Sequence, residues 1–114
     1  MVERFETKTR MSGAVVHGDT VYLAGQVPED PAADVPTQTR QVLAKIERLL
    51  ALAGTDKTKL LSATIWLTDM RYFQAFNEVW DAWVPEGHAP ARACVNALLA
   101  NPDFHVEIGI IAAR

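Results

Sequence analysis

The spacing of apolar residues divides the chain into short strands and two helices. Residues 2–7 favour a short edge strand, and residues 13–17 and 20–23 are two short apolar runs that favour strands. The second and third runs are separated only by Gly18-Asp19, a two-residue sequence typical of a β-hairpin turn. An acidic, proline-bearing segment at 28–36 then predicts a loop. The chain is therefore expected to begin with a strand followed by a hairpin.

The period of the apolar pattern changes to that of a helix near residue 34. The apolar face consists of Val42, Leu43, Ile46, Leu49, Leu50 and Ala53. Asp34 is a suitable N-cap and Pro36 fits the first turn, while Gly54 suits the position after the C-cap. These signals predict a helix between Asp34 and Gly54.

A second helix is predicted after a strand at Leu60–Leu67. Asp69 would cap it, and Pro85 and Gly87 would end it. Its apolar face consists of Phe73, Phe76, Trp80 and Trp83. Two final apolar runs, at 91–99 and 104–112, flank the turn-forming residues 101–103 and predict a last hairpin.

The predicted order is β-ββ-α-β-α-ββ, an α+β fold with two helices packed on one face of a mixed sheet. Two helices can cover only one face of that sheet. Because the other face still carries apolar residues, the pattern indicates a closed symmetric oligomer.

The predicted last hairpin would bring together several chemically active side chains. If Leu99 and Phe104 close its loop, Cys94 is opposite Gly109 and Asn96 is opposite Glu107. Side chains two positions apart share a face, so one polar face would hold Arg92, Cys94, Asn96, Glu107 and Gly109. The alternate residues Ala93, Val95, Ala97, Val106, Ile108 and Ile110 would face the helices. A pocket is then expected on the polar face, at the subunit contact.

The length, composition and charge of the chain exclude several classes of protein. The 114 residues fit a single domain, 1–114, which excludes a two-domain enzyme with its own nucleotide-binding half. The chain contains 49% hydrophobic and 22% charged residues, a composition unlike that of a disordered protein. A formal charge of −3 argues against a nucleic-acid partner.

Each candidate residue also has a purely structural interpretation. Arg92 could form an intersubunit ion pair with Glu107, and the single cysteine, Cys94, could be a small buried apolar residue. The spacing of the histidines matches no metal motif, so no metal site is predicted. The three tryptophans, Trp66, Trp80 and Trp83, are expected to be core or interface aromatics.

The expected location is the cytoplasm, without a membrane partner. One cysteine cannot form an intramolecular disulfide, and the charged residues near the N-terminus leave no apolar signal sequence. There is also no run of about 18 apolar residues that would span a bilayer.

Several short motifs resemble the RidA (YjgF) family. They are PARACV at 90–95, VEI at 106–108, LAGQVP at 23–28 and the Thr68-Asp69 pair that precedes the second helix. The resemblance covers about residues 11–114. It implies a chorismate-mutase-like α+β subunit, a homotrimer with a ligand cleft between neighbouring subunits, and no cofactor. The implied reaction is hydrolysis of enamines and imines such as 2-aminoacrylate to 2-keto acids and ammonia.

The same resemblance assigns roles to individual residues. Arg92 matches the arginine that grips the substrate carboxylate, and Glu107 the glutamate that positions water. Cys94 and Asn77 match residues that line the cleft. Gly25 belongs to the family's glycine-glutamine turn.

Two positions depart from the family pattern. Met11 replaces a tyrosine, and Ala24 replaces a serine beside the glycine-glutamine turn. The site therefore has two hydroxyls fewer, which indicates either imines of apolar amino acids as substrates or a slower reaction.

Two other functions remain open at the level of sequence. One is a non-catalytic, chaperone-like trimer that binds a small carboxylate in the same cleft. The other is the endoribonuclease or translation-inhibitor activity attributed to some members, which the acidic balance disfavours.

Overall fold

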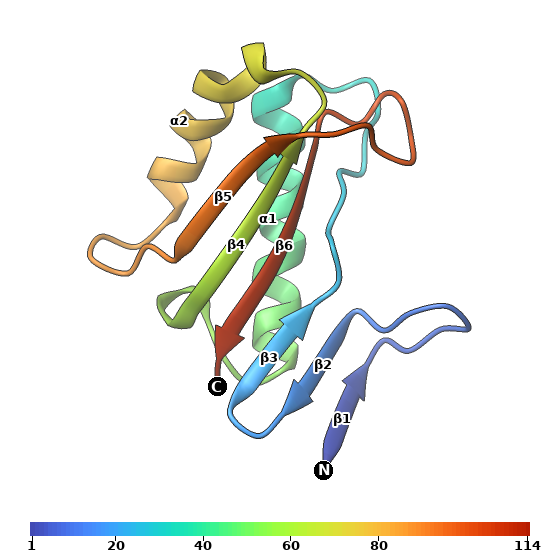
Figure 1. The fold of residues 1–114 in the computed structure, drawn as a ribbon, viewed down its shortest axis with the longest axis vertical. Helices are drawn as coiled ribbons and strands as arrows, with labels where there is room; N and C mark the ends of the chain where they lie inside the picture. Colours follow the sequence, from blue (N-terminus) through green and yellow to red (C-terminus); the bar gives the residue numbers. More distant parts are fainter.

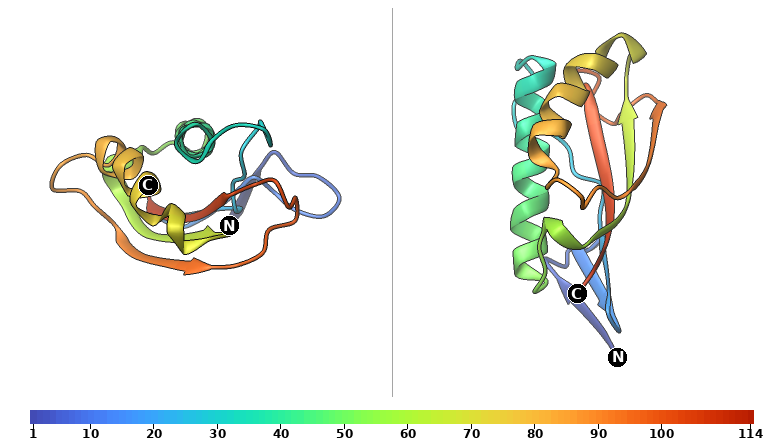
Figure 2. Two further views of the ribbon diagram at one scale, coloured as in Figure 1. Left: turned by 90° about the horizontal axis from the view of Figure 1, so that it is seen from above. Right: turned by 90° about the vertical axis from the view of Figure 1, so that its left-hand side faces the viewer.

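Six strands form a single sheet, and both helices lie on the same face of it (Figures 1 and 2). This computed structural model describes all 114 residues. The strands are β1 (Val2–Phe5), β2 (Ala14–His17), β3 (Thr20–Leu23), β4 (Leu60–Leu67), β5 (Ala91–Asn96) and β6 (Val106–Ala113). Their order across the sheet is β1-β2-β3-β6-β4-β5, and only the β4–β5 pair is parallel. The prediction of an α+β fold with a mixed sheet is confirmed.

Helix α1 (Val35–Leu52) begins and ends where its capping residues predict. The Asp34 carboxylate accepts a hydrogen bond of 2.9 Å from the backbone N–H of Thr37. At the other end Gly54 adopts φ +85°, and its N–H donates to the Ala51 carbonyl while that of Thr55 donates to Leu50. This Schellman arrangement needs a left-handed residue, a conformation that glycine adopts without a Cβ penalty.

Helix α2 (Phe73–Trp83) begins one turn later than its predicted cap. Asp69 instead caps the short 3₁₀ turn η2 (Met70–Tyr72), accepting a hydrogen bond from the N–H of Arg71. A second 3₁₀ turn, η1 (Lys57–Lys59), precedes β4. Neither α1 nor α2 is long and apolar enough to cross a membrane.

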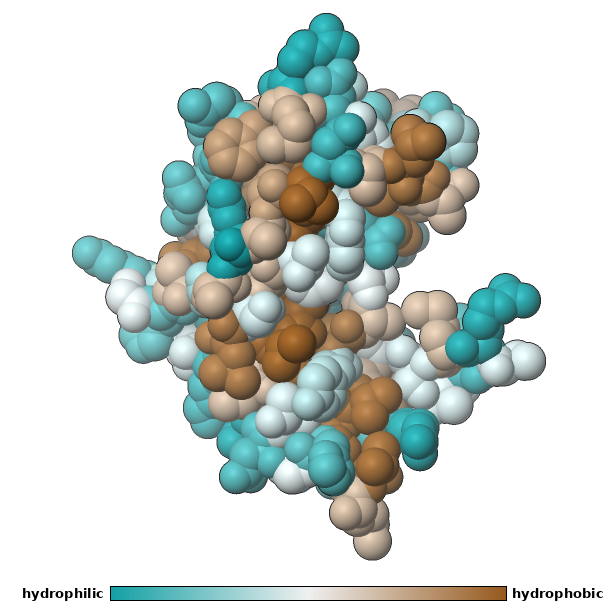
Figure 3. Space-filling view, viewed as in Figure 1, coloured by the Kyte–Doolittle hydropathy of each residue, from teal (hydrophilic) through white to brown (hydrophobic).

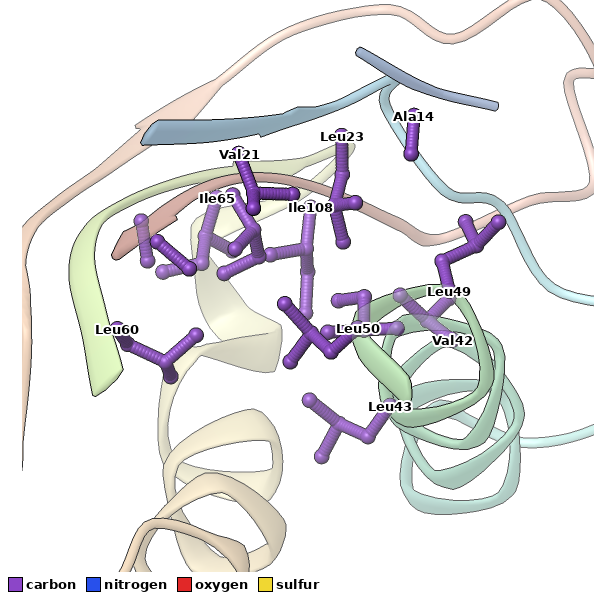
Figure 4. Close-up of a cluster of buried hydrophobic side chains, with 14 of the residues drawn as sticks. Ala14, Val21, Leu23, Val42, Leu43, Leu49, Leu50, Leu60, Ile65 and Ile108 are labelled. Carbon is purple, nitrogen blue, oxygen red and sulfur yellow. The ribbon is translucent and has the colours of Figure 1, made fainter. Parts of the chain in front are cut away.

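The core lies between α1 and the inner face of the sheet. Figure 4 shows Leu50 of α1 on the side of Ile108 of β6, and Leu49 directed toward Ala14 of β2. The inner face of β6 is continuous and apolar, with Val106, Ile108, Ile110 and Ala112 at most 2% exposed. Strand β6 is therefore buried at the centre of the sheet.

The predicted hairpin between the last two strands is wrong. Strand β4 lies between β5 and β6, and it pairs with both of them. Residues 101–103 do turn, since the Asp103 N–H donates to the Asn101 side chain, but this turn belongs to the longer connection 97–105. Two physical reasons decide the order. Helix α2 is a crossover that places β5 parallel to β4, and the fully apolar inner face of β6 needs the central position.

The open face of the sheet carries the exposed apolar residues that the pattern predicts. Figure 3 shows this face, with apolar side chains gathered along its middle. Tyr22 on β3 and Val95 on β5 are each 45% exposed. No helix covers these residues.

One fully buried polar side chain connects three segments. The Gln38 amide on α1 donates to the carbonyls of Asp30 and Asp103, at 3.2 and 3.1 Å, and accepts from the N–H of His105 at 2.8 Å. It therefore holds the loop before α1 and the β5–β6 connection against the same helix.

We expect Gln38→Ala to lower the free energy of unfolding by about 2–3 kcal/mol, because it leaves buried backbone groups without partners. Gln41→Ala is the matched control. The Gln41 side chain accepts from the exposed N–H groups of Glu29 and Asp30, so its loss should cost about 0.5–1 kcal/mol. Urea titrations of both variants would measure the difference, and equal losses would contradict the prediction.

Candidate functional site

The sheet separates the predicted polar residues onto two faces. In the ladder, Arg92 and Cys94 pair with Ala63 and Ile65, whose side chains are buried under the helices. Asn96 pairs with Leu67 in the same way. Paired residues share a face, so Arg92, Cys94 and Asn96 lie on the helix side.

Glu107 and Gly109 lie on the opposite, open face. They pair with Trp66 and Thr64, which alternate with the buried residues of β4. The prediction that all five polar residues share one face is therefore wrong, as is the placement of Ala93 and Val95 toward the helices. The cause is the strand order. The predicted faces depend on direct pairing of β5 with β6, and β4 lies between these two strands.

The Arg92 guanidinium is held against α2. Its Cζ lies 5.6 Å from the ring centroid of Trp80 and 5.9 Å from those of Phe73 and Phe76. One Nη donates to the Asn77 side-chain oxygen at 3.0 Å. These contacts orient the group through cation–π attraction and one neutral hydrogen bond.

No carboxylate lies within 4.0 Å of the Arg92 nitrogens, so its charge is uncompensated within the chain. Arg92 and Glu107 lie on opposite faces of the sheet and do not pair within the chain, so the predicted intersubunit ion pair between them stays a prediction. An exposed, oriented and unpaired guanidinium is suited to binding a carboxylate in a bidentate manner.

Cys94 is two residues from Arg92 on the same face and is half-buried. Burial raises the pKa of its thiol, and the positive charge of Arg92 only partly opposes this. The thiol form therefore predominates at neutral pH, and a thiol is a poor nucleophile. Cys94 is suited to line a site and not to attack a substrate.

The Glu107 carboxylate lies against Gly25. A Cβ at position 25 would stand 2.2 Å from Glu107 Oε2, so only glycine leaves room for this side chain. The neighbouring Gln26 holds the segment in place, because its N–H donates to the Ile108 carbonyl and its carbonyl accepts from the Ile108 N–H. Burial raises the pKa of Glu107.

The loop that carries Met11 adjoins the same place. The Ala24 N–H donates to the Gly13 carbonyl at 2.9 Å, which ties the loop before β2 to the segment that covers Glu107. Met11 itself is 55% exposed.

The candidate residues thus form two groups within one chain. We call Arg92, Cys94 and Asn77 the arginine half-site, and Glu107, Gly25 and Ala24 the glutamate half-site; Met11 lies on the separate loop before β2. A cavity of about 500 Å³ between α1 and α2 touches neither of them.

The sequence predicts the aromatic residues that hold Arg92 as the apolar face of the second helix, with Trp80 a core or interface aromatic. Phe73, Phe76 and Trp80 do pack against the core, but they also form the surface under the guanidinium. Their helical spacing was visible in the sequence. The missing step was the parallel β4–β5 pairing, which places α2 over Arg92.

Comparison with known proteins shows the family to which this chain belongs. A family model described as Endoribonuclease L-PSP matches residues 1–114. The chain belongs to the L-PSP family, which includes the YjgF, RidA and RutC proteins.

Relatives of this L-PSP member differ in how specifically they are named. A RutC family protein of Escherichia coli is 46% identical over 112 residues, covering 98% of this chain and 97% of the relative. A 2-iminobutanoate/2-iminopropanoate deaminase of Salmonella typhimurium is 33% identical over 104 residues, covering 85% and 81%. The crystal structure of a YjgF family protein from Neisseria meningitidis has a TM-score of 0.98 at 46% identity, covering 100% of this chain and 95% of that one.

The fit between Gly25 and Glu107 in this L-PSP chain can be tested by a double-mutant cycle. We expect Gly25→Ala to destabilise the fold by about 1–3 kcal/mol, because the new Cβ forces the carboxylate to move. Most of that loss should disappear when Glu107 is also replaced by alanine. Urea unfolding of the two single variants and the double variant gives the coupling free energy, and additive losses would show that the contact is not the cause.

Proposed function

We propose that this L-PSP family member hydrolyses enamines of the 2-aminoacrylate type and 2-imino acids to 2-keto acids and ammonia. The observation that carries the proposal is the oriented, uncompensated guanidinium of Arg92. Substrates of this class have a carboxylate next to the reacting carbon, which matches that group. The name of the Salmonella relative supports the same reaction class.

The active site would form between two protomers of a homotrimer. Within one chain the sheet itself separates Arg92 from Glu107, so a substrate between the two half-sites needs the arginine half-site of one protomer and the glutamate half-site of a neighbour. Tyr22, which is 45% exposed on the uncovered face, supports such an assembly, since its apolar surface would be buried against a second copy.

The proposed chemistry requires only side chains and water. Arg92 holds the substrate carboxylate and fixes the plane of the adjacent C=N group. The Glu107 carboxylate accepts a proton from water as the oxygen bonds to the carbon of the protonated imine, and the electron pair of the C=N bond moves to nitrogen, which becomes a neutral amine. Glu107 then returns that proton to the amine, and the C–N bond breaks as the hydroxyl oxygen forms the C=O bond of the keto acid. The hydroxyl proton leaves with the nitrogen, so the products are the keto acid and ammonium. An enamine enters this route after tautomerising to its imine.

The first test is deamination of imino acids that an amino-acid oxidase generates and semicarbazide traps. Wild-type protein should lower the yield of trapped imine. Arg92→Ala should reduce kcat/KM by about 30-fold or more, because a carboxylate in the cleft loses its charged partner. Arg71→Ala is the matched control, since Arg71 lies on η2 and pairs with Asp69 at the surface.

Mixing two inactive variants tests the position of the site. The two variants are Arg92→Ala and Glu107→Ala. Refolded together in equal amounts, they should form trimers in which the two chains are randomly mixed, and these trimers should regain about a quarter of wild-type activity. A quarter of the interfaces would then join an intact arginine half-site to an intact glutamate half-site. Absence of any recovery, with normal assembly mass by light scattering, would contradict a site between protomers.

The pH dependence should report the state of Glu107. Its charged form is the base, so kcat/KM should rise as pH increases through its pKa. Burial raises that pKa above the usual 4.5, which places the acid limb of the profile above that of an exposed glutamate. Glu107→Asp should keep an acid limb, whereas Glu107→Gln should have no measurable turnover. An activity that increases toward lower pH would exclude Glu107 as the base.

The oriented, unpaired guanidinium of Arg92 also supports a second candidate function, non-catalytic binding of a small carboxylate. An unpaired Arg92 would bind a small carboxylate whether or not a reaction follows. If 2-keto acids raise the melting temperature while trapped imine is unaffected, the protein is a carboxylate-binding module. Steeply salt-dependent RNA binding would instead favour the endoribonuclease activity named in the family description, against the formal charge of −3.

A further inference from the structure

We propose that Trp66 forms the apolar wall of the substrate pocket beside Glu107 and makes the site prefer imino acids with a large apolar side chain. This inference rests on the proposed function, and it names the substrate class of the same site. It assigns a specificity role to a residue that the sequence indicated only as a core or interface aromatic.

Trp66 and Glu107 are direct partners in the β4–β6 ladder on the open face. Residues paired in this way have Cβ atoms about 5 Å apart. The indole extends over Gly109, and its Cη2 and Cζ3 atoms lie 3.3 and 3.4 Å from where a Cβ at position 109 would stand. The ring and the carboxylate therefore occupy adjacent positions on the outer surface of β6.

The environment of Trp66 differs from that of the other two tryptophans. Trp80 and Trp83 contact each other on α2, and the Trp83 indole N–H donates to Glu47. Trp66 is half-buried on a face that no helix covers, and its N–H has no hydrogen-bond partner among the side-chain contacts of the chain. A large aromatic surface is thus available to a ligand that reaches Glu107.

Neighbouring residues extend the same apolar surface. Val95 pairs with Trp66 on β5 and is 45% exposed. The glutamate half-site contributes the methyl group of Ala24, which has no hydroxyl. A substrate side chain the size of that of leucine or phenylalanine would cover this wall, whereas the methyl group of 2-iminopropanoate would leave most of it in water.

Steady-state kinetics on three imino acids, derived from alanine, leucine and phenylalanine, tests the preference. For the wild type we expect kcat/KM to be about tenfold or more higher for the two large substrates. Trp66→Ala should remove this preference, mainly through KM, and change the alanine-derived reaction by less than about threefold. Trp83→Ala is the matched control and should keep the preference. Equal losses on all three substrates, or a wild-type preference for the small one, would overturn the inference.

A binding measurement separates this inference from the proposed deamination. Calorimetric titration with pyruvate and with 4-methyl-2-oxopentanoate needs no turnover. In one outcome, imines are not hydrolysed, the larger keto acid binds more tightly, and Trp66→Ala abolishes this difference in affinity. This outcome would support the role of Trp66 and contradict the proposed deaminase activity. In the opposite outcome, imines are hydrolysed and both keto acids bind Trp66→Ala as they bind wild type. This outcome would support the deaminase activity and contradict the role of Trp66. A change of assembly mass in Trp66→Ala would make Trp66 an interface residue and would also overturn the inference.

Discussion

Strand β6 exchanges backbone hydrogen bonds with β3 on one side and with β4 on the other. Its position between these two strands determines the face on which each candidate site residue lies. Its even-numbered residues from Val106 to Ala112 are buried under the helices. Strict alternation along a strand then forces Glu107 and Gly109 onto the open face. A slip of one residue would expose four buried apolar side chains, so the position of Glu107 follows from the energetics of the core.

The same sheet gives Arg92 a different environment. Strand β5 is an edge strand that pairs only with β4, and the crossover through α2 places aromatic rings beside it. The guanidinium gains cation–π attraction and one amide partner without meeting a carboxylate. Its charge is therefore oriented but not neutralised, which is the electrostatic condition for binding an anion. The fold thus presents Arg92 on one side of the sheet and Glu107 on the other.

The open face combines a protected carboxylate with apolar surface. Gly25 makes room for Glu107, and Gly109 makes room for the ring of Trp66. In both cases the absence of a Cβ lets a neighbouring side chain lie directly on the backbone. Desolvation by these close approaches is the reason that the pKa of Glu107 is raised. The chemistry and the specificity proposed for this face therefore depend on the same two glycines.

The sequence by itself determined the elements and most of their ends. Asp34 and Gly54 delimit α1 because capping is a local interaction, and Gly18 sits in the β2–β3 turn with φ +60° for the same reason. The family motifs likewise named Arg92 and Glu107 as candidate site residues. Only the tertiary structure decided which strands are neighbours. Residues 101–103 turn as their composition predicts, but a local turn does not specify whether the strands beyond it pair. Strand β6 occupies the centre of the sheet because it buries more apolar surface there than β5 would. The resulting strand order places Arg92 and Glu107 on opposite faces.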